Sequence, residues 1–411
     1  MDFSTHIKIA ARNVVRNRRR SLVTFLSVVI GFVALSLFEG YFVSVYDSLE
    51  DQAIVGERLG HLTIARKGFF QNGAQDPQAY AFSKDELATI ASKLGGLGNV
   101  ALVSPRLSLS GLISNGNSSR IYIGEGIRPE DMTVLRGEKY ANLPGMLDAS
   151  QPGAAILGKR LAENLGLKTG DNATLMGSTL DGLVNAVGVT LLAQTSTGNI
   201  GTDDKYVLTT LASAQRLMAF EGAERVVVLL KDPSTIVESA AAIEAAMLDL
   251  GIACEVRDWK TLSSYYGQVK GLFDAMYLFI SIVVAIVVIA SVFNTISMTI
   301  AERTREVGTL RALGMQIGSI DLLFVLEGML VVMAGCLAGA AITLALGGLI
   351  NSAGISYTPP DATEAVPLVV KLVGENLFGS LFTLVVLSAL ASYLPARRAS
   401  RRAITEALGH V

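Results

Sequence analysis

The sequence of 411 residues has few cysteines, few histidines and few charged residues. Its two cysteines, Cys254 and Cys336, exclude a disulfide framework, and Cys336 lies in an apolar run that makes the two unsuitable partners. Three widely scattered histidines argue against a histidine-based metal site. Charged residues make up 17% of the chain, against roughly 25% in soluble domains, which argues against a wholly soluble enzyme. A net charge of −2 gives no indication of nucleic-acid binding.

The sequence contains four long hydrophobic runs. Each is about 18 residues or longer, which is enough to cross a bilayer. The runs cover residues 22–45, 278–300, 322–350 and 377–394. The first contains Glu39 and the third contains Glu327. An acid within a span is a functional candidate by default. We interpret Glu39 as interfacial, and we expect Glu327 to pair with an arginine of the adjacent loop rather than to relay protons.

Lysine and arginine cluster before the first run, between the second and third, and after the fourth. Because basic residues stay on the cytoplasmic side, both termini are expected on that side of the membrane, with the loop after the first span on the outer side. We predict spans at 21–46, 272–300, 320–350 and 376–395, an outer domain at 47–271, a cytoplasmic loop at 301–319, a short outer loop at 351–375 and a cytoplasmic tail at 396–411.

Residues 1–20 are predicted to form a cytoplasmic amphipathic helix. Its predicted apolar face holds Ile7, Ala11, Val14 and Val15, and its basic face holds Lys8, Arg12, Arg16 and Arg19. Such a helix suits the surface of an anionic inner leaflet. A plain basic anchor for the first span explains the same pattern.

The outer domain is predicted to be α+β, because short strand and helix patterns alternate along it. We predict strands at 60–67, 107–113, 120–127, 190–194, 205–208 and 225–230, and helices at 83–94, 154–165, 211–220, 235–250 and 258–274. Ser83 and Glu86 form a capping-box pattern, and the Asn115-Gly116 pair predicts a hairpin. The last helix is expected to continue into the second span as a stalk. The fold class is therefore a membrane protein with four transmembrane helices and a large α+β domain between the first two.

No catalytic constellation is evident in the sequence. Residues 153–160 approach the phosphate-binding pattern GxxxxGK[ST], but Arg160 replaces the hydroxyl residue that binds magnesium. Asp203 and Asp204 fit a solvated turn better than a cation site. We therefore expect no catalytic residue, no metal and no cofactor held by this chain.

The cytoplasmic loop carries an unusual mixture of charge and glycine. Its sequence from 301 to 315 is AERTREVGTLRALGM, in which Glu302 and Arg305 are helical neighbours. Gly308 and Gly314 are unfavourable in a solvated helix and indicate close approach to another surface. An ordinary charged loop remains the alternative reading of its composition.

Residues 294–314, NTISMTIAERTREVGTLRALG, resemble the signature of MacB/FtsX-type ABC transporter permeases. The segments ARNVVRNRRRS at 11–21 and PARRAS at 395–400 are also similar to that family. The resemblance implies one span, a large outer domain and three further spans. It also implies a coupling helix at about 303–318. The residues that it marks for coupling to an ATPase are Glu302, Arg303, Arg305, Glu306, Gly308, Arg311 and Gly314.

By this resemblance the chain is a permease subunit without an ATPase site of its own. It would pair with two copies of a cytoplasmic ABC ATPase, which binds the ATP and magnesium, and with a second permease copy or paralogue. ATP-driven closure would then move the outer domains, a mechanism termed mechanotransmission. Membrane lipids and a periplasmic adaptor or lipoprotein chaperone are the other expected partners.

The branch of the family is indicated by residues 38–41 (FEGY) and 60–64 (GHLTI), which are similar to the LolC/LolE-like lipoprotein-releasing permeases. Lipoprotein or lipid release from the inner membrane is therefore the expected function. Efflux of a small molecule or peptide, as in MacB, is the alternative within the family. A signalling or scaffold protein that transports nothing is the alternative from another class.

Overall fold

The computed structural model describes residues 3–16, 18–73, 75–137, 147, 150–358 and 365–401. The chain divides into two compact units. The helical unit comprises residues 1–46, 269–356 and 367–411, and the globular unit comprises residues 47–268 and 357–366. The chain passes between the units inside α2 and again inside α12.

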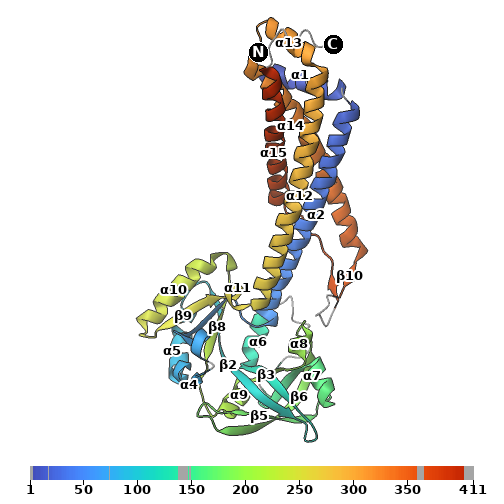
Figure 1. Ribbon diagram of the computed structural model, residues 1–411. Coiled ribbons are helices and arrows are strands. Elements are labelled where there is room, and N and C mark those ends of the chain that lie inside the picture. Colours follow the sequence, from blue (N-terminus) through green and yellow to red (C-terminus); the bar gives the residue numbers. More distant parts are fainter. Residues whose placement is uncertain are drawn as a thin grey trace. The chain divides into compact units, whose positions relative to one another are not determined.

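Within the described residues, four helices are long and apolar enough to cross a membrane. They are α2 (Arg18–Asp51), α12 (Ser264–Glu302), α14 (Ile317–Ala353) and α15 (Gly374–Ser400), and they run side by side in Figure 1. Two shorter helices, α1 (Phe3–Arg16) and α13 (Thr304–Ala312), lie together at one end of this bundle. Part of the predicted cytoplasmic tail, residues 402–411, lies outside the described residues.

The helical unit has its own apolar core. Val28 and Phe32 of α2 pack with Val292 of α12 and with side chains of α14 and α15. Two glycines of α14 allow α2 to approach closely. A Cβ atom at Gly335 would lie 2.8 Å from Val28 Cγ1, and one at Gly339 would lie 3.0 Å from the Phe32 ring. Small residues at such contacts are what brings helices together where lipid removes the hydrophobic driving force.

The globular unit is built on a nine-stranded mixed sheet in the order β3-β7-β4-β6-β5-β2-β8-β1-β9. Because β2 also pairs with β3, the six strands from β3 to β2 close on themselves, while β8, β1 and β9 extend from β2. The strands are β1 (Leu62–Arg66), β2 (Val100–Ser114), β3 (Ser119–Ile127), β4 (Ala154–Gly158), β5 (Asn172–Ser178), β6 (Val184–Thr195), β7 (Tyr206–Thr210), β8 (Arg225–Leu230) and β9 (Cys254–Asp258).

The helices of the globular unit are shorter and surround these strands (Figure 1). They are α3 (Phe69–Asn72), α4 (Pro77–Tyr80), α5 (Lys84–Gly95), α6 (Pro129–Arg136), α7 (Lys159–Leu165), α8 (Ile200–Asp203), α9 (Leu211–Met218), α10 (Ile236–Asp249) and α11 (Trp259–Leu262). A π-helical turn, η1 (Gln52–Gly56), follows α2. A separate two-stranded sheet joins β10 (Ser356–Tyr357) to β11 (Val366–Pro367).

The long strand β2 joins two lobes of the globular unit. Its first half pairs with β8, and its second half pairs with β3 and β5. One core lies among β1, β8, α5 and α10, and another fills the closed six-stranded sheet together with α7 and α9. Gly111 permits the change of partner, since a Cβ there would lie 2.0 Å from the carbonyl oxygen of Met176.

Several local predictions are confirmed. The domain is α+β, the Ser83–Glu86 capping box is formed, and the predicted hairpin is the β2–β3 pair. The buried strand predicted at 225–230 is β8. Strands β5 and β9 were not predicted from the sequence.

Two predictions about the outer domain are wrong. Residues 154–165 do not form one helix, because Ala154–Gly158 is a fully buried strand held between β6 and β7. Pairing on both sides overrides the helix propensity of alanine and leucine. The stalk is not one helix from 258 either, because Ser263, at φ −76° and ψ 97°, separates α11 from α12.

Candidate functional site

The cytoplasmic loop of the prediction contains a short helix, α13, set between two breaks. Arg303, at φ −106° and ψ 14°, separates it from α12. After Leu313 the chain turns through Gly314, whose φ of +90° favours glycine. The helix is therefore shorter than the implied coupling helix at 303–318, and Gly318 already belongs to α14.

Glu327 is the acid at the centre of this site. It is only 3% exposed, and its Oε1 accepts hydrogen bonds from Arg303 Nη1 at 2.9 Å and from Asn13 Nδ2 at 2.6 Å. The expected ion pair with an arginine of the loop is thus present. The cost of burying this carboxylate is therefore offset by one charged partner and one amide partner. The contact joins α14 to the start of α13 and to α1.

Arg303 extends this pair into a network. Its Nε donates to Glu306 Oε2 at 2.8 Å, and Glu306 also accepts from Arg16 Nη2 at 3.2 Å. The hydrogen bond from Arg303 lowers the pKa of the Glu306 carboxyl. A separate ion pair of 2.6 Å links Arg20 to Glu302. Charged contacts therefore tie α1 and the first turn of α2 to α13 and to the end of α12.

Sequence reasoning missed Asn13, Arg16 and Arg20 as members of this network. All three lie in the segment ARNVVRNRRRS, whose family resemblance was the signal that could have pointed to them. The side of α1 that packs against the other helices holds the buried residues His6, Ala10 and Asn13, and the predicted contact of its apolar face with the membrane stays a prediction. Ala10 packs on α14, whereas Val15 is 65% exposed.

Some residues in and next to α13 lie outside the charged network and are exposed to solvent. Arg305 is exposed, and Leu313 is 80% exposed at the end of α13. Gly308 lies on the buried side with Thr304 and Val307. Within the described residues of this chain, no atom lies within 4 Å of a Cβ built at Gly314, so close approach of that glycine to another surface stays a prediction. Glycine at position 314 is explained by the backbone φ of +90°. Arg311 lies near the end of α13 and is half-buried.

The other intramembrane acid, Glu39, lies outside this network. It is half-buried on α2, and its Oε2 accepts a hydrogen bond of 3.4 Å from Ser380 of α15. The contact links two spanning helices near the far ends of their apolar runs.

The near-match to a phosphate-binding loop folds as β4 followed by α7. Asp203 is 1% exposed, and its carboxylate accepts from the backbone N–H groups of Arg160 and Thr197, both at 3.0 Å. A carboxylate thus occupies the start of α7, where a phosphate would have to lie. The expectation that Asp203 belongs to a solvated turn is wrong, because its carboxylate is buried and accepts two backbone hydrogen bonds. Over the described part of the chain, no group of three or more His, Cys, Asp or Glu residues could hold a metal ion.

Comparison with known protein families gives two matches. Residues 21–246 match the MacB-like periplasmic core domain, and residues 278–404 match the FtsX-like permease C-terminal region. The second match includes α13 with Arg303 and Glu327, whereas Asn13, Arg16 and Arg20 precede the first match.

Curated relatives of two kinds are similar along nearly the whole chain. The pyoverdine export ATP-binding/permease protein PvdT of Pseudomonas putida is 24% identical over 94% of this chain, which spans only 56% of that relative. The lipoprotein-releasing system transmembrane protein LolC of Neisseria meningitidis is 25% identical and matches over 99% of both chains. Among solved structures, the extracellular domain of the transporter YknZ from Gram-positive bacteria has a TM-score of 0.33 and 13% identity, covering 48% of this chain and 99% of its own.

Proposed function

Because the chain belongs to the MacB/FtsX-type family of ABC transporter permeases, we propose that it is the membrane subunit of a mechanotransmission transporter. In this proposal a separate cytoplasmic ABC ATPase hydrolyses ATP, and α13 receives the resulting movement. The two termini and α13 are on the cytoplasmic side of the inner membrane, and the globular unit is outside. Members of the family work with such ATPases, and the four apolar helices make this chain an integral membrane protein.

The observation that carries the proposal is the charged network around Glu327. The Arg303–Glu327 pair connects the start of α13 to α14, and the Arg16–Glu306 pair connects α13 to α1. Asn13 joins α1 to α14 through Glu327. A displacement of α13 therefore has to move α14 or break the buried Arg303–Glu327 hydrogen bond, and charge-assisted bonds of this kind are among the strong ones in proteins. The link to α1 is the exposed Arg16–Glu306 pair. Because the chain crosses between the units inside α2 and α12, helices also provide the connection to the globular unit.

Arg305 and Leu313 are the residues that we propose contact the ATPase. They combine a cation with a large exposed apolar side chain on the accessible side of α13. Isolated exposed leucines are ordinary, but Leu313 precedes a glycine turn at one end of α13 while Arg305 lies in the first turn at the other, and arginine is enriched in protein contacts. We propose two ATPase copies and a second permease, identical or paralogous.

We further propose that the cargo is a lipoprotein or lipid released from the membrane. The relative LolC supports this branch because the match extends over 99% of both chains. Efflux of a small molecule or peptide is the second candidate, supported by the relatives named for pyoverdine and macrolide export.

The first test is affinity purification of the tagged full chain in mild detergent, with mass spectrometry of what co-purifies. A stoichiometric ABC ATPase is the expected result, and a bound lipoprotein would select the release branch. An intact permease that never retains an ATPase would contradict the proposal and favour a signalling or scaffold role.

The coupling role has its own test in proteoliposomes that contain the permease and its ATPase. Glu302→Lys, Glu306→Lys and Gly308→Leu should each lower cargo release at least tenfold while ATP hydrolysis continues. The first breaks the ion pair with Arg20 at the end of α12, and the other two alter the contacts of α13. The matched control is Glu244→Lys on the exposed part of α10, which should leave release unchanged. Full release in all three of these variants would refute the coupling role.

A further inference from the structure

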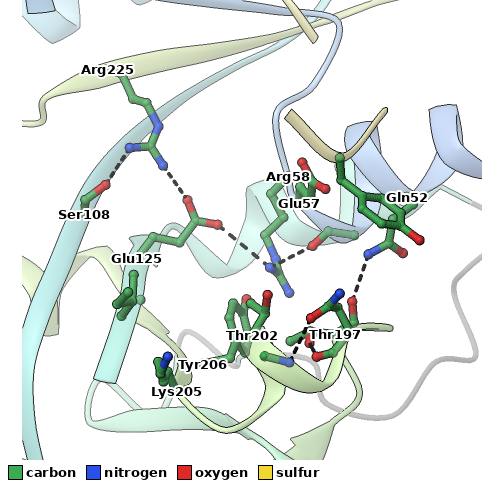
Figure 2. A pocket seen from close by; sticks show the side chains of 16 residues that line it. Gln52, Glu57, Arg58, Ser108, Glu125, Thr197, Thr202, Lys205, Tyr206 and Arg225 are labelled. Atoms are coloured by element: carbon green, nitrogen blue, oxygen red, sulfur yellow. Dashed lines mark hydrogen bonds and ion pairs between the residues drawn. The ribbon is translucent and has the colours of Figure 1, made fainter. Parts of the chain in front are cut away.

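The globular unit contains a cavity of about 500 Å³ that the proposed mechanism does not use. Figure 2 shows it between η1 and the strands β2, β3, β7 and β8. Its charged lining residues are Glu57, Arg58, Glu125, Lys205 and Arg225, and its aromatic ones are Tyr206 and Tyr265. Its size is that of a small-molecule site.

Strand register places another arginine beside this cavity. Arg106 of β2 lies directly opposite Arg225 of β8, and Ser108 lies opposite Glu125 of β3. Alternate residues of a strand point to the same face, so Arg106 shares the face of Ser108. Ser108, Glu125 and Arg225 all line the cavity. Arg106 is therefore the next residue on that face of β2, adjacent to the lining residues, and its own side chain is fully buried rather than part of the lining.

Arg106 is buried near the carboxylates of Glu125 and Asp131 but makes no side-chain hydrogen bond within the described residues. It is 0% exposed, and over the described part of the chain none of its three guanidinium nitrogens has a hydrogen-bond partner. The buried hydroxyl of Tyr206, which lines the cavity, has none either. Burial lowers the pKa of Arg106 to about 10, which still leaves the side chain charged at neutral pH. An unpaired buried cation is costly, so its persistence indicates a missing partner.

The neighbouring carboxylates are already engaged by other cations. Figure 2 shows Glu125 between two arginines: Arg225 Nη2 lies 3.0 Å from it, and Arg58 Nη1 lies 3.9 Å from it. Asp131, which also acts electrostatically on Arg106, is bound by Arg128 at 2.7 Å. Arg106 and Arg225 also face each other across the strand pair, an arrangement that is unfavourable for like charges.

We propose that this cavity binds an oxyanion, the phosphate or carboxylate group of a small molecule or headgroup, with Arg58 and Arg225 in its lining and the buried Arg106 next to Arg225 as the cations that attract it. A guanidinium has five N–H donors in a planar fork that matches both groups. The hydroxyl of Tyr206 supplies a further donor. Tyr265 and Ile123 give the rest of the ligand an apolar wall. The proposal concerns the globular unit alone and does not depend on the ATPase.

The charge balance of the site favours an anion over a cation. Three basic and two acidic side chains line the cavity before Arg106 is included. Glu125 is held in ion pairs, and burial raises the pKa of Glu57, which favours the neutral form of that carboxyl group. An entering cation would meet Arg58 and Arg225 with no free carboxylate pair to hold it.

Thermal unfolding of the full chain in dodecyl maltoside tests the proposal, with inorganic phosphate as the first probe and sodium chloride at matched ionic strength as its control. A ligand that binds the folded state raises the unfolding temperature as its concentration rises. We expect a rise on the order of several degrees with phosphate and none with chloride. Hexanoate and dihexanoyl phosphatidylglycerol then separate a carboxylate from a phosphodiester headgroup, with dihexanoyl phosphatidylcholine as the zwitterionic control.

Arg106→Met should abolish the phosphate-dependent rise. Without phosphate it should unfold at the wild-type temperature or above, because it removes an uncompensated charge while keeping the volume. Arg120→Met, on the exposed part of β3, is the matched control and should keep the full response. Should Arg106→Met fail to fold, Lys205→Gln at the exposed edge of the cavity should weaken the response. No rise in the wild type, or an equal rise in Arg106→Met or in Lys205→Gln, would overturn the proposal.

Discussion

Two buried charges, one in each unit, differ in whether they have hydrogen-bond partners. Glu327 of the helical unit has Arg303 and Asn13 within 2.9 Å, and each supplies a hydrogen bond. Arg106 of the globular unit has no hydrogen-bond partner among the described residues. The first arrangement holds helices together by itself. The second is complete only when something else enters, so burial of charge serves structure in one unit and ligand binding in the other.

The largest expected effect comes from breaking the compensated pair. Arg303→Met leaves Glu327 buried and charged with only an amide partner, and the helical unit should lose about 3–5 kcal/mol of unfolding free energy. Denaturant unfolding in mixed micelles measures it, with the exposed Arg305→Met as the control. Adding Glu327→Leu to Arg303→Met should recover most of the loss. A single variant as stable as the wild type would mean that the pair carries no structural role.

The same change at the uncompensated charge should behave differently. Arg106→Met is expected to stay within about 1 kcal/mol of the wild type or to exceed it in the absence of ligand, because no hydrogen bond is lost. The measurement is denaturant unfolding of the globular unit within the full chain. A loss comparable to that of Arg303→Met would show that Arg106 is satisfied in the free protein, and the contrast between the units would disappear.

The smallest effect is expected at the exposed edge of the Glu327 network. Half of the Glu306 side chain is exposed, so Glu306→Gln should cost less than about 1 kcal/mol. Because Arg303 holds its pKa below 4.5 in the folded state, the carboxylate stabilises the fold above pH 4.5, and this contribution is lost as the pH falls through the lowered value. Unfolding of wild type and variant between pH 7 and pH 3 should therefore converge at the acid end. A constant difference would exclude ionisation of Glu306 as its cause.

Prediction from sequence succeeded best where the signal is local. The capping box needs only Ser83 and its third neighbour, and the β2–β3 hairpin needs only its turn. It failed at Ala154–Gly158, where the helical composition is outweighed by strands on both sides. The same distinction applies to the site. The family signature marks Arg303 and Glu306, but that Asn13 meets Glu327 depends on how α1 packs against α14.

By itself, the sequence determined the apolar runs, the basic clusters at their ends and the alternating patterns of the globular unit, because hydrophobicity and charge act residue by residue. Only the tertiary structure decided that β2 closes a six-stranded sheet with β3 and β5, and that Arg106 lies beside Arg225, 119 positions further along the chain. Strand pairing joins distant segments through backbone hydrogen bonds that any residue can make. The composition of β2 therefore does not indicate its partners, whereas the register of the folded sheet does.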